Sequence, residues 1–141
     1  QPYTRSDAET YLEACRIGWR DGANANFAIV VDGMPVGSIG IRWFEPSHGV
    51  AEVGYWVAPG ARGKRVCTRA LRLVSGWALA LPGMFRLQLR ADEENVPSKR
   101  VAENAGFTRE GVLRSSHYNP RLNRRVDFVM YSLLPGELGQ S

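Results

Sequence analysis

The apolar residues of this 141-residue chain recur with a helical period in some stretches and alternate with polar residues in others. The first stretch has the helical period, with apolar positions at Ala8, Leu12, Cys15 and Trp19. Ser6 as N-cap and Glu9 three residues later match a capping box. The pattern therefore predicts a helix that starts at Ser6 and ends near Gly18 or Gly22.

Three strands are predicted next. The apolar run at residues 27–31 ends at Asp32-Gly33, a strong hairpin signal, and residues 36–43 alternate as its partner strand. Residues 50–57 alternate most clearly. One face of this third strand carries Ala51, Val53, Tyr55 and Val57, and the other carries Glu52, Gly54 and Trp56.

A second helix follows the basic loop at residues 60–65, and Pro82-Gly83 ends it. Its apolar positions are Val66, Ala70, Leu73, Val74, Trp77 and Leu81. Residues 85–90 alternate again and predict a strand. A strand, a helix and a strand in this order predict a right-handed parallel crossover.

The last part of the chain predicts a third helix and two final strands. Asn95 is the N-cap of that helix, Pro97 lies in its first turn and Gly106 is a C-cap candidate. The strands cover residues 107–114 and 126–133, and the polar stretch 115–125 is expected to be a loop. Together these elements predict one mixed α/β domain without internal repeats.

The amino-acid composition supports a single globular domain. The hydrophobic share is 44% and the charged share is 23%, which are globular values. Two cysteines without a C-x-x-C pair provide neither a disulfide framework nor a zinc site, which fits the cytoplasm. The uncharged run at residues 73–85 is too short to span a bilayer. We therefore expect a cytoplasmic protein with no metal and no membrane partner.

Charge is distributed unevenly, although the net charge is only +4. No acidic residue occurs between Glu52 and Asp92, and the basic residues of that interval are Arg62, Lys64, Arg65, Arg69, Arg72, Arg86 and Arg90. Cations at the start of a helix oppose its dipole, so this cluster favours an anionic ligand over a merely solvated basic face. The free N–H groups of the helix start also favour an anion. We interpret the loop as a phosphate site, but not as a P-loop, because G-K-[ST] is absent.

Several segments together resemble the GNAT N-acetyltransferases, and within them the bacterial branch that acetylates ribosomal-protein N-termini. They are AEVGYWVAP, ARGKRVCTRAL, ENVPSKRVAENAGF, the EGVLR strand and a last strand ending in YSLLPGE. The resemblance spans residues 3–137 and implies an α/β (α+β) fold. Its mixed, mostly antiparallel central sheet is flanked by helices, and a parallel strand pair splays at the cofactor site. The family begins with a further strand and helix, so we expect a single domain over 1–141 that lacks roughly thirty to fifty N-terminal residues.

The resemblance implies acetyl-CoA as donor, an amine as acceptor and no metal. Pantetheine would pair with the strand end at residues 55–57, and the pyrophosphate would lie on backbone N–H groups of residues 62–68. Asn95 of the N-x-x-S motif would hold the pantetheine amides. The cofactor-binding residues expected on this basis are Tyr55, Trp56, Val57, Arg62, Gly63, Lys64, Arg65, Val66, Cys67, Thr68, Asn95, Ser98 and Arg100.

Glu52 and Ser98 are the candidate catalytic residues. Acetyl transfer needs a neutral amine, a polarised carbonyl and a proton for the leaving thiolate. Glu52 would take the amine proton through water, or else it forms a cross-strand ion pair. Ser98 would donate to the sulfur, or else it belongs to the helix cap. His117 and Tyr118 are further candidates on the acceptor side.

One position of the loop departs from the family pattern in a way that matters. Arg65 stands where the family has glycine, and Cys67 stands where it has glycine or alanine. Arg65 either crowds the diphosphate or pairs with a phosphate. A GNAT-like domain that binds acyl-CoA without transfer is therefore one alternative, and a basic nucleic-acid-binding module is another, although no recognition-helix pattern is present. The acceptor, a protein N-terminus or a small amine, and a homodimer stay open.

Overall fold

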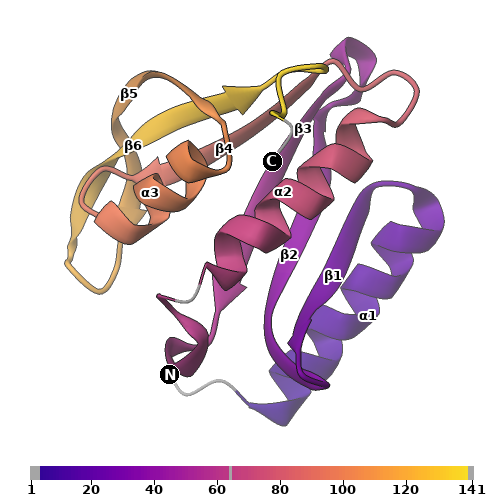
Figure 1. Ribbon diagram of the computed structural model, residues 1–141. Helices are drawn as coiled ribbons and strands as arrows, with labels where there is room; N and C mark the ends of the chain where they lie inside the picture. Colours follow the sequence, from indigo (N-terminus) through magenta and orange to yellow (C-terminus); the bar gives the residue numbers. More distant parts are fainter. Residues whose placement is uncertain (1–3, 64, 140–141) are drawn as a thin grey trace.

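The computed structural model describes residues 4–63 and 65–139 (Figure 1). In chain order its elements are α1 (Arg5–Asp21), β1 (Asn24–Val31), β2 (Met34–Glu45), β3 (Val50–Val57), α2 (Val66–Leu79), β4 (Arg86–Asp92), α3 (Val96–Asn104), β5 (Thr108–Asn119) and β6 (Arg124–Leu133). The 3-10 turns η1 (Pro46–His48) and η2 (Pro59–Ala61) precede β3 and α2. Lys64 of the predicted phosphate loop lies outside the described residues.

The strands form one six-stranded sheet with the order β1-β2-β3-β4-β6-β5. Every neighbouring pair is antiparallel except β3 and β4, which confirms the mixed sheet and the parallel pair. The parallel ladder runs only from Val50↔Arg86 to Glu52↔Gln88. Residues 53–57 of β3, the splayed segment, pair with β2 but have no ladder partner toward β4 among the described residues.

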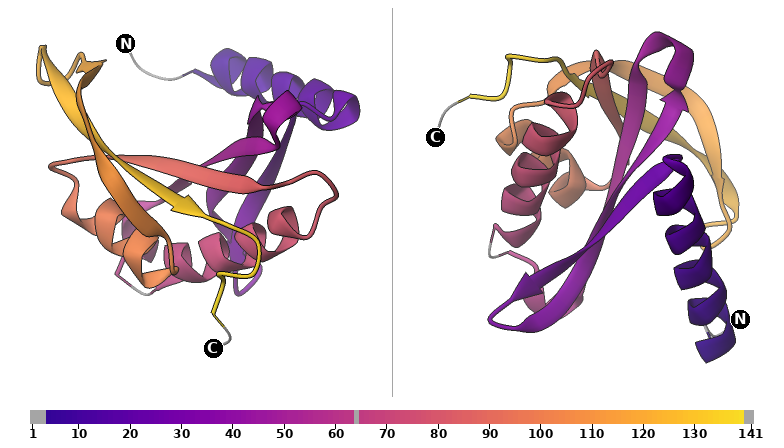
Figure 2. Two further views of the ribbon diagram at one scale, coloured as in Figure 1. Left: turned by 90° about the horizontal axis from the view of Figure 1, so that it is seen from above. Right: turned by 90° about the vertical axis from the view of Figure 1, so that its right-hand side faces the viewer.

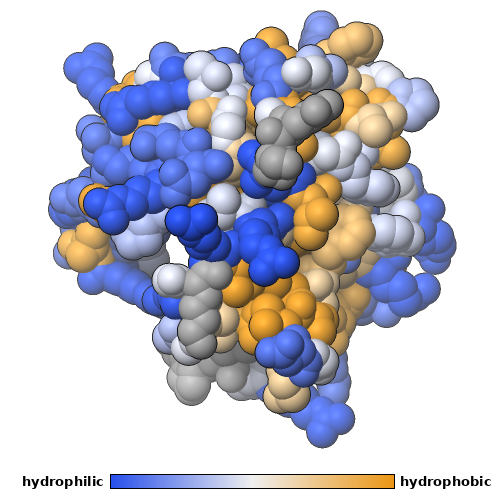
Figure 3. Space-filling view, in the orientation of Figure 1, coloured by the Kyte–Doolittle hydropathy of each residue, from blue (hydrophilic) through white to orange (hydrophobic). Residues whose placement is uncertain are grey.

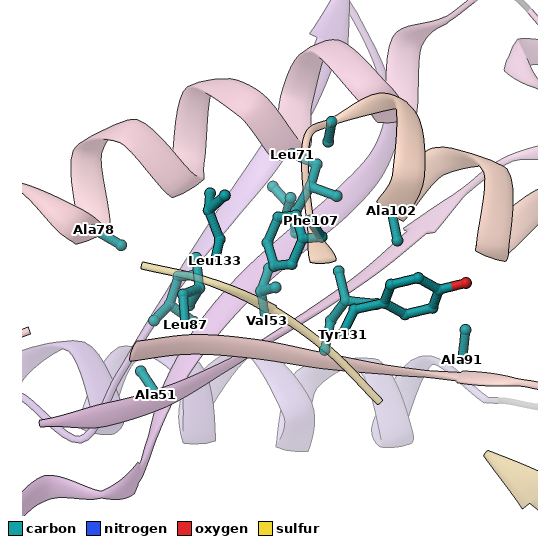
Figure 4. Close-up of a cluster of buried hydrophobic side chains, with 14 of the residues drawn as sticks. Ala51, Val53, Leu71, Ala78, Leu87, Ala91, Ala102, Phe107, Tyr131 and Leu133 are labelled. Carbon is teal, nitrogen blue, oxygen red and sulfur yellow. The ribbon is translucent and has the colours of Figure 1, made fainter. Parts of the chain in front are cut away.

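Helices cover the two faces of this sheet unequally. Figure 2 shows α2 and α3 on one face and α1 on the other. The α2–α3 face holds the core, in which Leu71, Leu87, Leu133 and other side chains are fully buried (Figure 4). Ala51, Val53 and Val57 of β3 are buried in it, as the alternation predicts. No helix among the described residues is long and apolar enough to cross a membrane.

Polar and apolar side chains are also unevenly distributed over the surface. In the space-filling view, hydrophilic side chains cover the α3–β5–β6 half, and apolar side chains gather beside α2 in the middle of the view (Figure 3). Leu73 of α2 is 76% exposed, so the predicted helical stripe is broader than the part that the core buries. Hydrophobic period alone therefore did not fix the buried width of α2.

The start of α1 differs from the prediction. Thr4, not Ser6, is the N-cap: its hydroxyl accepts a hydrogen bond from the Asp7 N–H at 3.1 Å, and the Asp7 carboxylate accepts one from the Thr4 N–H at 2.9 Å. Glu9 instead pairs with Arg5 at 2.9 Å. Two capping-box patterns overlap here, and the one with both reciprocal bonds forms. The helix ends at Asp21, next to Gly22, which is one of the two predicted ends and is the left-handed C-cap.

The predicted apolar side of α1 is largely exposed. Gly18 is its one buried residue, whereas Leu12 and Trp19 are 64% and 53% exposed. A helical period therefore marked an amphipathic helix but not a core helix.

The polar stretch at residues 115–125 is mostly strand, so the loop expected there was wrong. β5 continues to Asn119 and β6 begins at Arg124, which leaves a turn at residues 120–123. The Arg125 guanidinium stabilises this arm by donating to the Ser115 carbonyl at 2.9 and 3.0 Å. The arm has few buried side chains, so its pairing relies on backbone and polar contacts that an apolar period does not report.

Candidate functional site

α2 begins without a side-chain cap, directly after the basic loop at residues 60–65. Arg65 is its N-cap, and its side chain makes no capping bond. The N–H groups in the first turn of a helix have no partner within the helix, so those of Val66, Cys67 and Thr68 are available to a ligand. α1 and α3, in contrast, are both capped by side chains.

Arg65 has φ 59° and ψ 13°, which is the left-handed region. Glycine reaches this region without steric cost, and a residue with a Cβ pays about 1 kcal/mol or more. This geometry explains why glycine belongs at this position of the family pattern. The Arg65 side chain is exposed and has no hydrogen bond or ion pair to the residues that the structure describes.

The other residues of the predicted phosphate site divide into anchors and free groups. Arg62 is an anchor, because its Nε donates to the Val57 carbonyl at 3.2 Å and ties the loop to the end of β3. Gly63 has φ 79°, which allows the turn. Arg100 of α3 is exposed and has no polar partner within the described ranges. Burial raises the pKa of the Cys67 thiol to about 11, so this thiol is protonated near neutral pH.

Tyr55 connects the splayed segment to α3. Its hydroxyl lies 3.3 Å from both the backbone oxygen and the Oγ of Ser98. Burial raises the pKa of Tyr55 to about 12, so its hydroxyl keeps its proton. Asn95 Oδ1 accepts a hydrogen bond from the Ser98 N–H at 3.1 Å and caps α3. The structure thus brings the predicted Tyr55, Asn95 and Ser98 together at one edge of the splay.

A pocket of about 410 Å³ lies on the α1 face of the sheet, and we call it the sheet pocket. Its lining comes from α1 and from β1, β2 and β3: Tyr11, Asn24, Asn26, Ser38, Gly40, Ile41, Arg42, Glu52, Val53, Gly54, Tyr55 and Trp56. Gly40 and Gly54 are register partners in its floor. A Cβ at Gly54 would meet no atom within 4 Å, so the pocket is open where β3 splays.

Glu52 is the acidic residue of this pocket, and arginines surround it. Arg90 binds both carboxylate oxygens, with Nε to Oε1 at 2.7 Å and Nη2 to Oε2 at 2.8 Å. Arg42 Nη2 donates to Oε2 at 2.8 Å, and Gln88 Nε2 donates to Oε1 at 3.3 Å. Burial works to raise the pKa of Glu52, but these hydrogen bonds and charges outweigh burial and lower it.

The cross-strand ion pair, the alternative role considered for Glu52, is therefore what the structure contains. A carboxylate with a lowered pKa and no free oxygen is a weak base. The role of Glu52 as general base stays a prediction that this geometry disfavours.

His117 and Tyr118 lie in β5 rather than in a loop. The His117 ring stacks on Phe128 at a centroid distance of 4.0 Å, and its Nδ1 is 2.8 Å from the Ser116 hydroxyl. Tyr118 donates its hydroxyl hydrogen to Asn123 across the turn. Neither residue belongs to the described lining of the sheet pocket. The structure therefore gives them local partners outside this lining.

Residues that sequence reasoning missed line the same pocket. Asn24 and Asn26 of β1 and Ser38 and Arg42 of β2 share its face. Their signal in the sequence is polar alternation with a period of two on neighbouring strands, and Asn24 and Asn26 lie before the strand predicted at residues 27–31. Within residues 4–63 and 65–139, no group of three or more histidine, cysteine, aspartate or glutamate side chains is placed to hold a metal ion.

Comparison with known proteins agrees with this geometry. The family model described as "Acetyltransferase (GNAT) domain" matches residues 1–108. The putative ribosomal N-acetyltransferase YdaF of Bacillus subtilis is 32% identical over 136 residues, which cover 94% of this chain and 73% of that protein. The spermidine N(1)-acetyltransferase of Escherichia coli is 27% identical over 93 residues, which cover 66% and 50%. The structure of Mycobacterium smegmatis RimJ in complex with CoA-disulfide has a TM-score of 0.87 at 26% identity, covering 96% of this chain and 65% of that one.

Proposed function

The chain belongs to the acetyltransferase (GNAT) domain family, and we propose that it transfers the acetyl group of acetyl-CoA directly to a primary amine in a ternary complex. One observation carries this proposal. The ladder between β3 and β4 ends at Glu52, so the splayed segment lies between the uncapped start of α2 and the sheet pocket. A donor that reaches from the α2 side would meet an acceptor from the α1 side at this segment.

The phosphate end of acetyl-CoA is assigned to the start of α2. Backbone N–H groups of residues 66–68 and the positive end of the helix dipole would hold the pyrophosphate. The exposed guanidinium of Arg65 is free to contact a phosphate, and so is that of Arg100. Arg65 has the left-handed backbone conformation that glycine would adopt, and its side chain is exposed, so its presence is compatible with cofactor binding.

The pantetheine arm is assigned to the edge of the splayed segment. There it would take the place of a neighbouring strand and pair with backbone groups of residues 55–57. The Asn95 amide lies beside this edge, at the start of α3. Val57 provides a backbone N–H group as a candidate for polarising the thioester carbonyl, because alternation along β3 turns the Trp56 N–H toward β2.

The chemistry then divides between two sides of the thioester. The amine nitrogen attacks the carbonyl carbon, the carbon–sulfur bond breaks, and the thiolate takes a proton. We assign that proton to the Ser98 hydroxyl, which Tyr55 contacts from a protonated hydroxyl. Because Glu52 is fully paired, the proton lost by the amine would leave through water, and Ser98 would regain its proton through water.

Two measurements test the proposal. Acetyl-CoA should raise the melting temperature, since a ligand that binds the folded state stabilises it. An amine panel should then release free thiol from acetyl-CoA. Stabilisation without thiol release would favour the domain that binds without transfer. Steeply salt-dependent binding to an oligonucleotide, without either effect, would favour the nucleic-acid-binding module.

We also propose three further properties of the protein. They are a cytoplasmic location, a homodimer, and a single domain over residues 1–141. Sedimentation of the protein at several concentrations measures the dimer directly.

A further inference from the structure

The charged side chains of the sheet pocket restrict which amines it can bind as acceptor. Among the described residues that line it, Glu52 carries the one carboxylate and Arg42 the one guanidinium. Amines are protonated in water near neutral pH, so a pocket that binds a polyamine needs free carboxylates for the second ammonium group. Whether Glu52 is free therefore decides between classes of acceptor.

Glu52 has no oxygen to offer to such a group. Four donors from Arg90, Arg42 and Gln88 occupy its two oxygens at 2.7 to 3.3 Å. A carboxylate has about four lone-pair sites, so its acceptor capacity is filled. An ammonium group would have to displace a guanidinium and leave that charge without its partner.

Arg42, in contrast, keeps most of its donors. It uses one Nη on Glu52, and a guanidinium has five N–H donors. Its side chain is 56% exposed, and its guanidinium lies 5.5 Å from the Phe44 ring centre, which limits its movement. Arg90 donates hydrogen bonds to Glu52 from both Nε and Nη2, and its side chain is only 21% exposed. With two arginines and one glutamate, the cluster carries a charge of +1.

The register fixes how far this charge lies from the reaction. Arg42 is opposite Glu52, and Gly40 is opposite Gly54, two residues further along the same strands. Two residues of a strand span roughly 7 Å. An amine that reaches the splayed segment at Gly54 therefore lies roughly 7 Å along the strands from the position of Arg42.

We propose that the acceptor is a primary amine with a carboxylate or phosphate within roughly 7 Å of its nitrogen, that Arg42 binds this anion, and that polyamines are poor acceptors. A peptide N-terminus with an acidic first or second residue has this chemistry, and so does a small phosphorylated amine. The inference rests on the proposed function, because it specifies the acceptor of that reaction.

The test uses matched acceptors. Ala-Asp-Ala amide and Ala-Asn-Ala amide differ only in charge, 2-aminoethyl phosphate represents the small anionic amine, and spermidine represents the polyamines. For the unchanged protein, kcat/KM for the aspartate peptide should exceed that for the asparagine peptide about tenfold, which corresponds to one charge-assisted hydrogen-bonded contact. Spermidine should fall below both. A phosphate amine that outperforms the peptides would identify the small-molecule source.

Arg42→Gln supplies the decisive variant. Glu52 keeps Arg90 in this variant, so the fold should persist, and a melting curve checks that. The ratio of kcat/KM for the aspartate peptide to kcat/KM for the asparagine peptide should fall from about ten to about one. Arg16→Gln removes the same charge from an exposed ion pair on α1 and should leave the preference unchanged.

Binding without reaction separates this inference from the proposed function. Calorimetry with CoA in place of acetyl-CoA measures the affinity of each peptide and of spermidine, whether or not transfer occurs. Absence of thiol release with every amine would reject the transferase and leave the charge preference measurable. Spermidine binding as tightly as the aspartate peptide, or an unchanged peptide preference in Arg42→Gln, would overturn the inference.

Discussion

On β4, Leu87 and Leu89 belong to the buried core, whereas the residues between and beside them, Arg86, Gln88 and Arg90, bind glutamates and one another. The same alternation divides the whole sheet. Its α2–α3 face is apolar and closely packed, and its α1 face carries ion pairs around the sheet pocket. The first face stabilises the fold, and the second positions charges beside the splayed segment. Substitutions on the two faces should therefore have different consequences.

The largest effect on stability is expected from Leu87→Ala. Leu87 is fully buried, and truncating such a residue costs about 3 kcal/mol in lost transfer energy and cavity formation. Urea unfolding measures the loss. The acetyl-CoA affinity of the molecules that remain folded should stay close to the original. The neighbour Gln88→Ala, on the other face, should cost clearly less, and equal losses would contradict the division into two faces.

Glu52→Gln tests the polar face. The amide would keep one acceptor oxygen and place N–H groups against two guanidinium groups, so we expect a loss of roughly 2 kcal/mol in stability. kcat/KM should fall because Arg42 loses its anchor, and acetyl-CoA affinity should change little. Glu13→Gln, in an exposed ion pair on α1, is the control. Unchanged turnover would remove Glu52 from the mechanism altogether.

The two faces also differ in how far the sequence predicted them. Alternation alone placed Ala51, Val53 and Val57 in the core, because burial on one face is a local property of a strand. The network around Glu52 joins residues from three strands, and Gln88 and Arg90 of β4 lie 36 and 38 residues from Glu52 in the chain. Their meeting depends on strand order and register, which no local period encodes.

The dependence on strand order and register also explains which site residues the sequence predicted and which it did not. The motif residues Asn95 and Ser98 were predicted because they are neighbours in sequence, and Tyr55 because of the resemblance. Arg42 was missed, since its meaning depends on Glu52, ten residues away on the adjacent strand. The conformation of Arg65 was likewise not predicted, although its departure from the family glycine marked the position.

Arg65→Gly tests the uncapped end of α2. Removing the side chain relieves a left-handed conformation and should raise stability by about 1 kcal/mol. If the guanidinium contacts a phosphate, the Kd for acetyl-CoA should rise severalfold at the same time. Asp32→Gly is the control, because Asp32 has φ 50° in the β1–β2 turn. It should gain stability without changing the Kd, and an unchanged Kd in Arg65→Gly would remove the guanidinium from the site.

A smaller effect concerns acid. Arg86, with the Ser132 hydroxyl, lowers the pKa of Glu110 to about 2. A carboxyl with a lowered folded pKa contributes stability above its unfolded pKa near 4.5 and loses it as the pH falls toward 2. The contribution should be below about 1 kcal/mol, because the Glu110 side chain is 40% exposed. Glu110→Gln should therefore flatten the decline of stability between pH 4.5 and 2, measured by urea unfolding at each pH.

The smallest effect is expected on the apolar face itself. The Ser75 hydroxyl of α2 is fully buried and has no hydrogen-bond partner among the described residues. Removing an unpaired polar atom relieves its desolvation and leaves a very small cavity, so Ser75→Ala should change stability by no more than about 1 kcal/mol, in the stabilising direction. Ser132→Ala, which removes a hydroxyl that donates to Glu110 at 2.6 Å, should destabilise instead. If the free energy of unfolding rises in Ser75→Ala and falls in Ser132→Ala, the α2–α3 face excludes polar atoms and the α1 face depends on them. Changes of the same sign would contradict this difference.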